Sequence, residues 1–167
     1  MTKQMHEVKD RLLSDFEKNL DDIYSRYQTA QDDALKKFQE TFSIVNKKLL
    51  QKIEEVNSKY LCKMTENIGD EELKNLTIEF EEQLDLVSKE HEETSKDASD
   101  ALETALKNAS VEHNRDLNIA QQHIQNRLHT YFDKWCFNYI KNPQSRVFSL
   151  STFIESSVHH DQKFPNW

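Results

Sequence analysis

The chain has 167 residues, of which 31% are charged and 36% hydrophobic, and its formal net charge at pH 7 is −8. It contains one glycine, Gly69, and two prolines, both after residue 142. Because chain reversals usually need clusters of Gly, Pro, Asn or Asp, this composition argues against a compact domain of many short elements. A single glycine also excludes a P-loop and a dinucleotide-binding fingerprint, since both motifs need more than one.

An apolar stripe runs along the N-terminal part of the chain with a mean spacing of about 3.7 residues, close to the 11/3 spacing of an eleven-residue repeat. Its members are Met5, Val8, Leu12, Phe16, Leu20, Ile23, Tyr27, Ala30, Ala34, Phe38, Phe42, Val45, Leu49, Ile53, Val56, Tyr60, Met64 and Ile68. Three doublets at eleven-residue intervals widen it: Leu12–Leu13, Ile23–Tyr24 and Ala34–Leu35. This pattern predicts a helix over residues 3–68 that contacts more than one neighbouring helix.

A second stripe follows Gly69 and thins to polar residues around His91 and Thr94, which occupy stripe positions. Its apolar members are Leu73, Leu76, Phe80, Leu84, Val87, Ala98, Leu102, Ala105, Ala109, Leu117, Ala120, Ile124, Leu128, Tyr131, Trp135 and Tyr139. This stripe predicts a second helix over residues 71–141.

The predicted turn between the helices lies at residues 69–70. We expect Gly69 to end the first helix in the left-handed conformation and Asp70 to cap the second. Glu71 and Glu72 suit the first turn of a helix, where the helix dipole favours negative charge.

The charge distribution distinguishes a hairpin from a single bent rod. In a hairpin that reverses at residues 69–70, residue i lies opposite about residue 139 − i. Residues 36–63, with seven lysines against three glutamates, then lie beside residues 76–103, with ten acids against two lysines. Net charges of +4 and −8 therefore face each other.

The same register places bulky residues opposite small ones, which lets two helices pack closely. Phe38 and Phe42 fall opposite Ala98 and Ala101, and Tyr27 and Ala30 fall opposite Ala109 and Val111. We therefore predict an all-α fold, a long antiparallel, coiled-coil-like helical hairpin over residues 1–141.

Residues 142–167 form a predicted C-terminal tail. Pro143 ends the second helix because it lacks a donor and disfavours a helical residue before it. Thr152 and Glu155 have the spacing of a capping box, which favours a short helix at residues 153–159.

An aromatic block at the end of the second helix is the candidate partner-binding site. Its members are Tyr131, Phe132, Trp135, Phe137 and Tyr139. Their apolar surface is wider than one partner helix covers. Two explanations remain open: packing against Met5, Val8 and a returning segment of the tail, or docking of another subunit.

The sequence predicts no catalytic, cofactor or metal site. His113, His123 and His129, with Asp116 and Asp133 nearby, lack the Glu-x-x-His pairs of a di-metal bundle. Neither cysteine, at positions 62 and 136, lies in a sequence context that indicates a nucleophile with a base positioned beside it. We expect a non-enzymatic protein without a cofactor.

The sequence therefore predicts a structural or adaptor protein that acts through helix–helix contacts, by self-association or with other helical subunits. The acidic charge argues against binding to nucleic acid or anionic membranes. Because no apolar run of signal-peptide length occurs at the N-terminus, we expect an intracellular location, in the cytoplasm or nucleus. The alternative is an amphipathic protein of lipid surfaces, since such helices also use eleven-residue periodicity.

Overall fold

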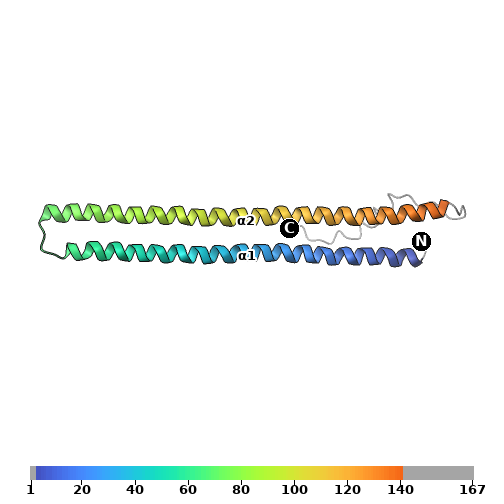
Figure 1. The fold of residues 1–167 in the computed structure, drawn as a ribbon, viewed down its shortest axis with the longest axis horizontal. Helices are drawn as coiled ribbons and strands as arrows, with labels where there is room; N and C mark the ends of the chain where they lie inside the picture. Colours follow the sequence, from blue (N-terminus) through green and yellow to red (C-terminus); the bar gives the residue numbers. More distant parts are fainter. Residues whose placement is uncertain (1–2, 141–167) are drawn as a thin grey trace. The chain divides into compact units, whose positions relative to one another are not determined.

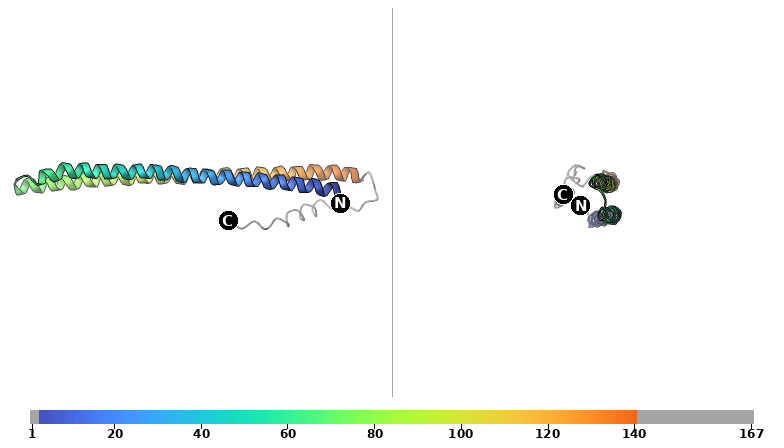
Figure 2. Two further views of the ribbon diagram at one scale, coloured as in Figure 1. Left: turned by 90° about the horizontal axis from the view of Figure 1, so that it is seen from below. Right: turned by 90° about the vertical axis from the view of Figure 1, so that its left-hand side faces the viewer.

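The computed structural model describes residues 3–140, which form two α-helices (Figure 1). α1 spans Lys3–Met64 and α2 spans Asp70–Ile140. No strand occurs within residues 3–140. The two helices lie side by side and run in opposite directions (Figures 1 and 2), which confirms the predicted all-α helical hairpin.

The hairpin divides into two units, and each is described by itself. Unit 1 contains the described residues up to Asp21 and from Leu117 onward, and unit 2 contains Asp22–Asp116 with the connection between the helices. The tail and its short helix at 153–159 lie outside the described residues. The same holds for the side chains of residue 132 and residues 134–140.

α1 ends at Met64, four residues before the predicted end at residue 68. The Thr65 amide still donates a helical hydrogen bond to the Leu61 carbonyl at 3.2 Å. The Thr65 hydroxyl, however, donates to the Cys62 carbonyl at 2.8 Å. A threonine hydroxyl that bonds a nearby carbonyl offers the backbone an alternative to further helix. The Ile68 amide then donates two residues back, to the Glu66 carbonyl at 2.9 Å, a tight turn that no helix contains.

Gly69 caps α2, so the predicted roles of Gly69 and Asp70 were wrong. The Leu73 amide donates to the Gly69 carbonyl at 2.9 Å, which makes Gly69 the N-cap and Asp70 the first helical residue. Gly69 does not have a positive φ. The reversal is spread over residues 65–69, so no single left-handed residue is needed. Asp70, Glu71 and Glu72 do lie in the first turn, as the helix dipole favours.

The helices meet along the two predicted stripes, and we call this row of residues the contact line. Every position of the first stripe except Ala30 is buried or half-buried. The buried side chains are large on α1 and small on α2: Met5, Leu12, Ile23 and Tyr60, against Ala98, Ala109 and Ala120. Two of the small residues that the prediction placed opposite bulky ones, Ala98 and Ala109, are among them.

The register within unit 2 differs from the prediction by one residue at two aromatic contacts. The ring of Tyr60 lies 5.8 Å from that of Phe80, where the predicted register places residue 79. The ring of Tyr27 stacks on that of His113 at 4.3 Å, where residue 112 was expected.

Five residues expected on the contact line are exposed: Ala30, Leu73, Thr94, Ala101 and Val111. An α-helix turns 100° per residue, so the residue four positions after the buried Ala98 returns closer to the contact line than the one three positions after it. Leu102 is accordingly half-buried. Val111 is two residues beyond the buried Ala109, which turns it to the far side of α2.

We expect Gly69→Ser to raise the free energy of unfolding by about 0.5–1 kcal/mol. Serine is a favoured N-cap residue and restricts the unfolded chain more than glycine does. A Cβ added at position 69 meets no atom within 4 Å, so the change introduces no clash. Urea unfolding at one fixed protein concentration measures the effect. A loss of more than about 1 kcal/mol would show that residue 69 needs a conformation reserved for glycine.

We expect Ala98→Phe to destabilise the hairpin by about 1–3 kcal/mol, because it overpacks a buried position. The matched control is Ala101→Phe, three residues away and exposed, which should change stability by less than about 0.5 kcal/mol. Thermal unfolding of the two variants compares them directly. Equal effects would contradict the observed contact line.

Candidate interaction surface

Unit 2 has two chemically different faces, one on each side of the contact line. On one face, ion pairs connect the helices: Lys52 Nζ binds the Glu90 carboxylate, and Arg26 Nη1 lies 3.3 Å from Asp116 Oδ2. We call this side the ion-pair face. Lys52 and Glu90 immediately precede the half-buried residues Ile53 and His91.

Glu90 and Lys89 are the residues whose pKa the charges of this region shift. The hydrogen bond from Lys52, with its positive charge, lowers the pKa of Glu90. The hydrogen bond to Asp85 at 2.7 Å, with its negative charge, raises the pKa of Lys89. The stabilisation from Glu90 is present at neutral pH and is lost as pH falls through its lowered pKa. That from Lys89 is lost only as pH rises through its raised pKa. Both pairs are exposed and therefore weak.

A groove of about 260 Å³ follows the contact line on the ion-pair face. Its lining residues are Thr41, Ile44, Val45, Lys48, Leu49, Lys52, Val87, Glu90, His91 and Thr94. Ile44 lies at its edge with 59% of its surface exposed. The lining of the groove therefore combines apolar residues with the charged residues Lys48, Lys52 and Glu90.

His91 forms a polar layer in the contact line, at the point where the second stripe thins. Its Nε2 lies 3.0 Å from Asn46 Oδ1 on α1, and Ser95 Oγ lies 3.5 Å from the same nitrogen. His91 is half-buried as the stripe predicted, whereas Thr94 is exposed and its hydroxyl bonds the Glu90 carbonyl at 2.9 Å. Ser95 replaces Thr94 as the half-buried residue.

The opposite face of unit 2 exposes leucines, and we call it the leucine face. Leu35, Leu50 and Leu61 are 43%, 67% and 51% exposed. Each immediately follows a contact-line residue, so it turns away from the ion-pair face, where residues precede the contact line. Leu50 and Leu61 line a groove of about 280 Å³ along α1, with Ile53, Glu54, Asn57, Ser58 and Cys62.

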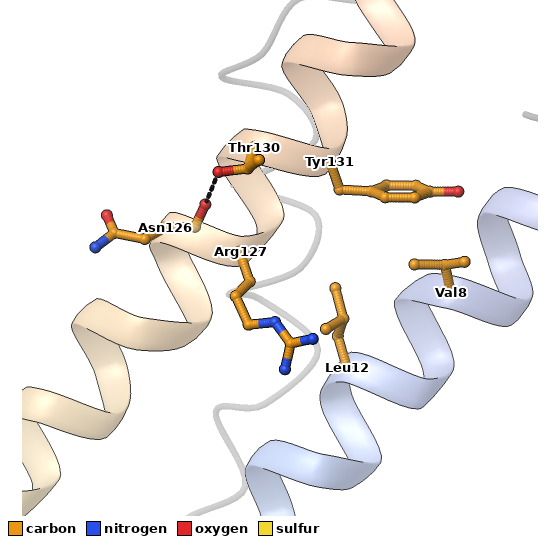
Figure 3. Close-up of a pocket in the computed structure, with 6 residues that line it drawn as sticks. All are labelled: Val8, Leu12, Asn126, Arg127, Thr130 and Tyr131. Atoms are coloured by element: carbon orange, nitrogen blue, oxygen red, sulfur yellow. Dashed lines mark hydrogen bonds between the residues drawn. The ribbon is translucent and has the colours of Figure 1, made fainter.

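The described part of the aromatic block lies in unit 1. Tyr131 is half-buried and lines a groove of about 290 Å³ together with Val8, Leu12, Asn126, Arg127 and Thr130. Its ring extends toward Val8, and Arg127 extends toward Leu12 (Figure 3). Tyr131 and Val8 thus line one groove, and both explanations for the aromatic block stay open.

The other four candidate residues are Phe132, Trp135, Phe137 and Tyr139. They belong to α2, but their side chains lie outside the described part of the chain. Docking of a partner on them therefore stays a prediction.

Two of the residues considered for a metal site take part in packing and ion pairing instead. His113 stacks on Tyr27, and Asp116 pairs with Arg26 and, at 3.8 Å, with Arg115. Across the described residues, no group of three or more His, Cys, Asp or Glu side chains is arranged to hold a metal ion.

Sequence reasoning missed His113 as a contact-line residue. Its Nδ1 is buried without a hydrogen-bond partner among the described residues. The spacing carries the signal, since His113 lies four residues after Ala109 and four before Leu117. A search limited to apolar residues passes over it.

No protein family, curated protein or solved structure matches this chain. Within residues 3–140, neither helix is long and apolar enough to cross a membrane. The surfaces of the hairpin are therefore the basis for inferring its function.

Proposed function

We propose that this chain is a non-enzymatic structural or adaptor protein, which acts through helix–helix contacts as a subunit of a larger intracellular assembly. The observation that supports the proposal is the amount of apolar surface that the two helices leave uncovered.

The core of the described hairpin is thin. Its most completely buried side chains, Ile23 and Ala120, keep 3% of their surface exposed, and most of the contact line is only half-buried. Among the side chains that the structure describes, ten large hydrophobic residues are exposed: Tyr24, Leu35, Ile44, Leu50, Leu61, Leu73, Ile78, Leu86, Val111 and Ile119. Two helices cover only one side of each other, and further helices are the usual means of covering the rest.

The proposed partners are helical, either a second copy of this chain or other helical subunits. Residues 76–103 carry a net charge of −8. This charge repels nucleic acid and anionic membranes, both of which are negative. The aromatic block at the end of α2 is a second proposed contact for such a partner.

The first test compares helicity with and without lipid. We expect the full chain to be helical by circular dichroism and to unfold cooperatively in buffer alone. Vesicles of mixed phosphatidylserine and phosphatidylcholine should leave its spectrum unchanged. A chain that is disordered in buffer and becomes helical only on vesicles would contradict the proposal and support a protein of lipid surfaces.

The second test concerns the aromatic block. If it is a docking surface, Trp135→Ala should keep the helicity and thermal stability of the protein but weaken binding to a helical partner by about 2 kcal/mol or more. If the block instead packs within the chain, the same change should lower the melting temperature. Thermal unfolding and co-purification under native conditions, on the same variant, separate these outcomes. A variant that keeps both stability and partners would exclude the block as a contact.

A further inference from the structure

The leucine face of unit 2 carries two complementary strips. On α1 the large residues Leu50 and Leu61 are eleven positions apart and exposed. The strip that immediately follows the contact line on α2 consists of small hydroxyl residues at the same eleven-residue interval: Thr77, Ser88, Ser99 and Ser110. In antiparallel helices, the residues that come directly after a contact-line residue lie on one face, whichever helix they belong to. Those that come directly before a contact-line residue lie on the other face, which here is the ion-pair face.

The small strip can be covered at low cost. The Thr77 hydroxyl already donates to the Leu73 carbonyl at 2.8 Å, and the Ser99 hydroxyl to the Ser95 carbonyl at 3.1 Å. Burying a hydroxyl that has its hydrogen bond leaves no donor unpaired. At Thr77 and Ser99, a leucine from a facing helix can therefore pack on the strip without leaving an unsatisfied polar group.

A large strip and a small strip on one face make that face self-complementary, which is the requirement for a symmetric dimer. If a two-fold axis runs parallel to the helices, each residue of one copy lies at the level of the same residue of the other. α1 of one copy then lies on α2 of its partner in the register of the hairpin itself. Ser88 and Thr77 lie within about 3 Å, along the helix, of the levels of Leu50 and Leu61.

Charge favours the same arrangement. The arrangement places residues 36–63, which carry a net charge of +4, on residues 76–103 of the partner, which carry a net charge of −8. Lys47 then lies near the level of Glu92 of the second copy, and Lys36 lies near the level of its Glu103. One pair has like charges, since Glu54 lies near the level of Asp85 of the second copy. Stacking α1 on α1 at equal levels would instead bring two basic segments together.

We propose that the leucine face is a homodimer interface, in which α1 of one hairpin packs on α2 of a second copy with the two hairpins parallel. The dimer buries Leu50 and Leu61 against the hydroxyl strip of the partner. The proposal rests on the proposed function and names the partner of this face.

Sedimentation equilibrium of the full chain tests the proposal. At about 50 μM, well above a micromolar dissociation constant, we expect twice the chain mass of 19.8 kDa. Leu50→Glu should raise the dissociation constant of the dimer about tenfold or more. The matched control is Ile44→Glu, which changes an exposed apolar residue of the same helix on the ion-pair face and should leave the dimer intact. A monomeric wild-type chain, or equal effects of both changes, overturns the proposal.

Orientation is tested through Cys62, which is exposed and lines the leucine groove. In the parallel dimer the two α1 helices lie diagonally, about 11–14 Å apart given usual interaxial distances. In Cys136→Ser protein, a bismaleimide linker of about that length should therefore join two copies at Cys62. No cross-link in a confirmed dimer would show that the copies are not parallel and would overturn the proposal.

A charge swap tests whether the partner is a second copy. Lys47→Glu should weaken the dimer several-fold. The double variant Lys47→Glu, Glu92→Lys should restore it, because residue 47 of one copy then again meets a residue of opposite charge at position 92 of the other. No recovery in the double variant overturns the proposed register. A chain that is monomeric, yet is helical and unfolds cooperatively without lipid, would contradict the proposed dimer. It would not contradict the proposed structural or adaptor function.

Discussion

One constraint governs this protein, namely that a helix can cover only one side of its neighbour. The apolar residues recur close to the 11/3 spacing, so each stripe stays on one side of its helix over a long distance. Two such stripes face each other and produce a contact line without a completely enclosed interior. The half-buried core, the exposed flanks and the grooves on either side all follow from having two helices where a bundle uses more.

Within this limit, polar residues specify how the helices align. Opposite charges pair across the ion-pair face, and Asn46 meets His91 inside the contact line. The ion pairs are exposed and weak individually. A half-buried amide that bonds an imidazole is more selective, since a shift along the helix would separate Asn46 from His91 and leave the amide without this partner. The polar interruption of the second stripe is therefore part of how the register is determined.

Long-range features of the fold were predictable from the sequence, and local geometry was not. The stripes, the antiparallel arrangement and the register follow from periodicity and charge summed over many residues, so one misplaced member such as Ala30 does not alter them. The end of α1 depends on a few competing hydrogen bonds around Thr65, which composition does not reveal. Gly69 was assigned a left-handed role from residue type alone, whereas its observed role is that of an N-cap. Of the candidate site, the sequence names the aromatic residues around Tyr131, and their role stays a prediction. The asymmetry between the two faces of unit 2 emerges only when both helices are placed together.

The connection of residues 65–69 has a consequence for how an assembly forms. A short tether holds α2 beside α1 at an effective concentration in the millimolar range, whatever the amount of protein present. Pairing of the two helices within one chain is therefore a unimolecular step, insensitive to dilution. Contacts between chains follow mass action and respond to expression level. In the proposed assembly, one covalent link would thus separate folding of the hairpin from its association with other chains, and protein abundance would control the second step alone.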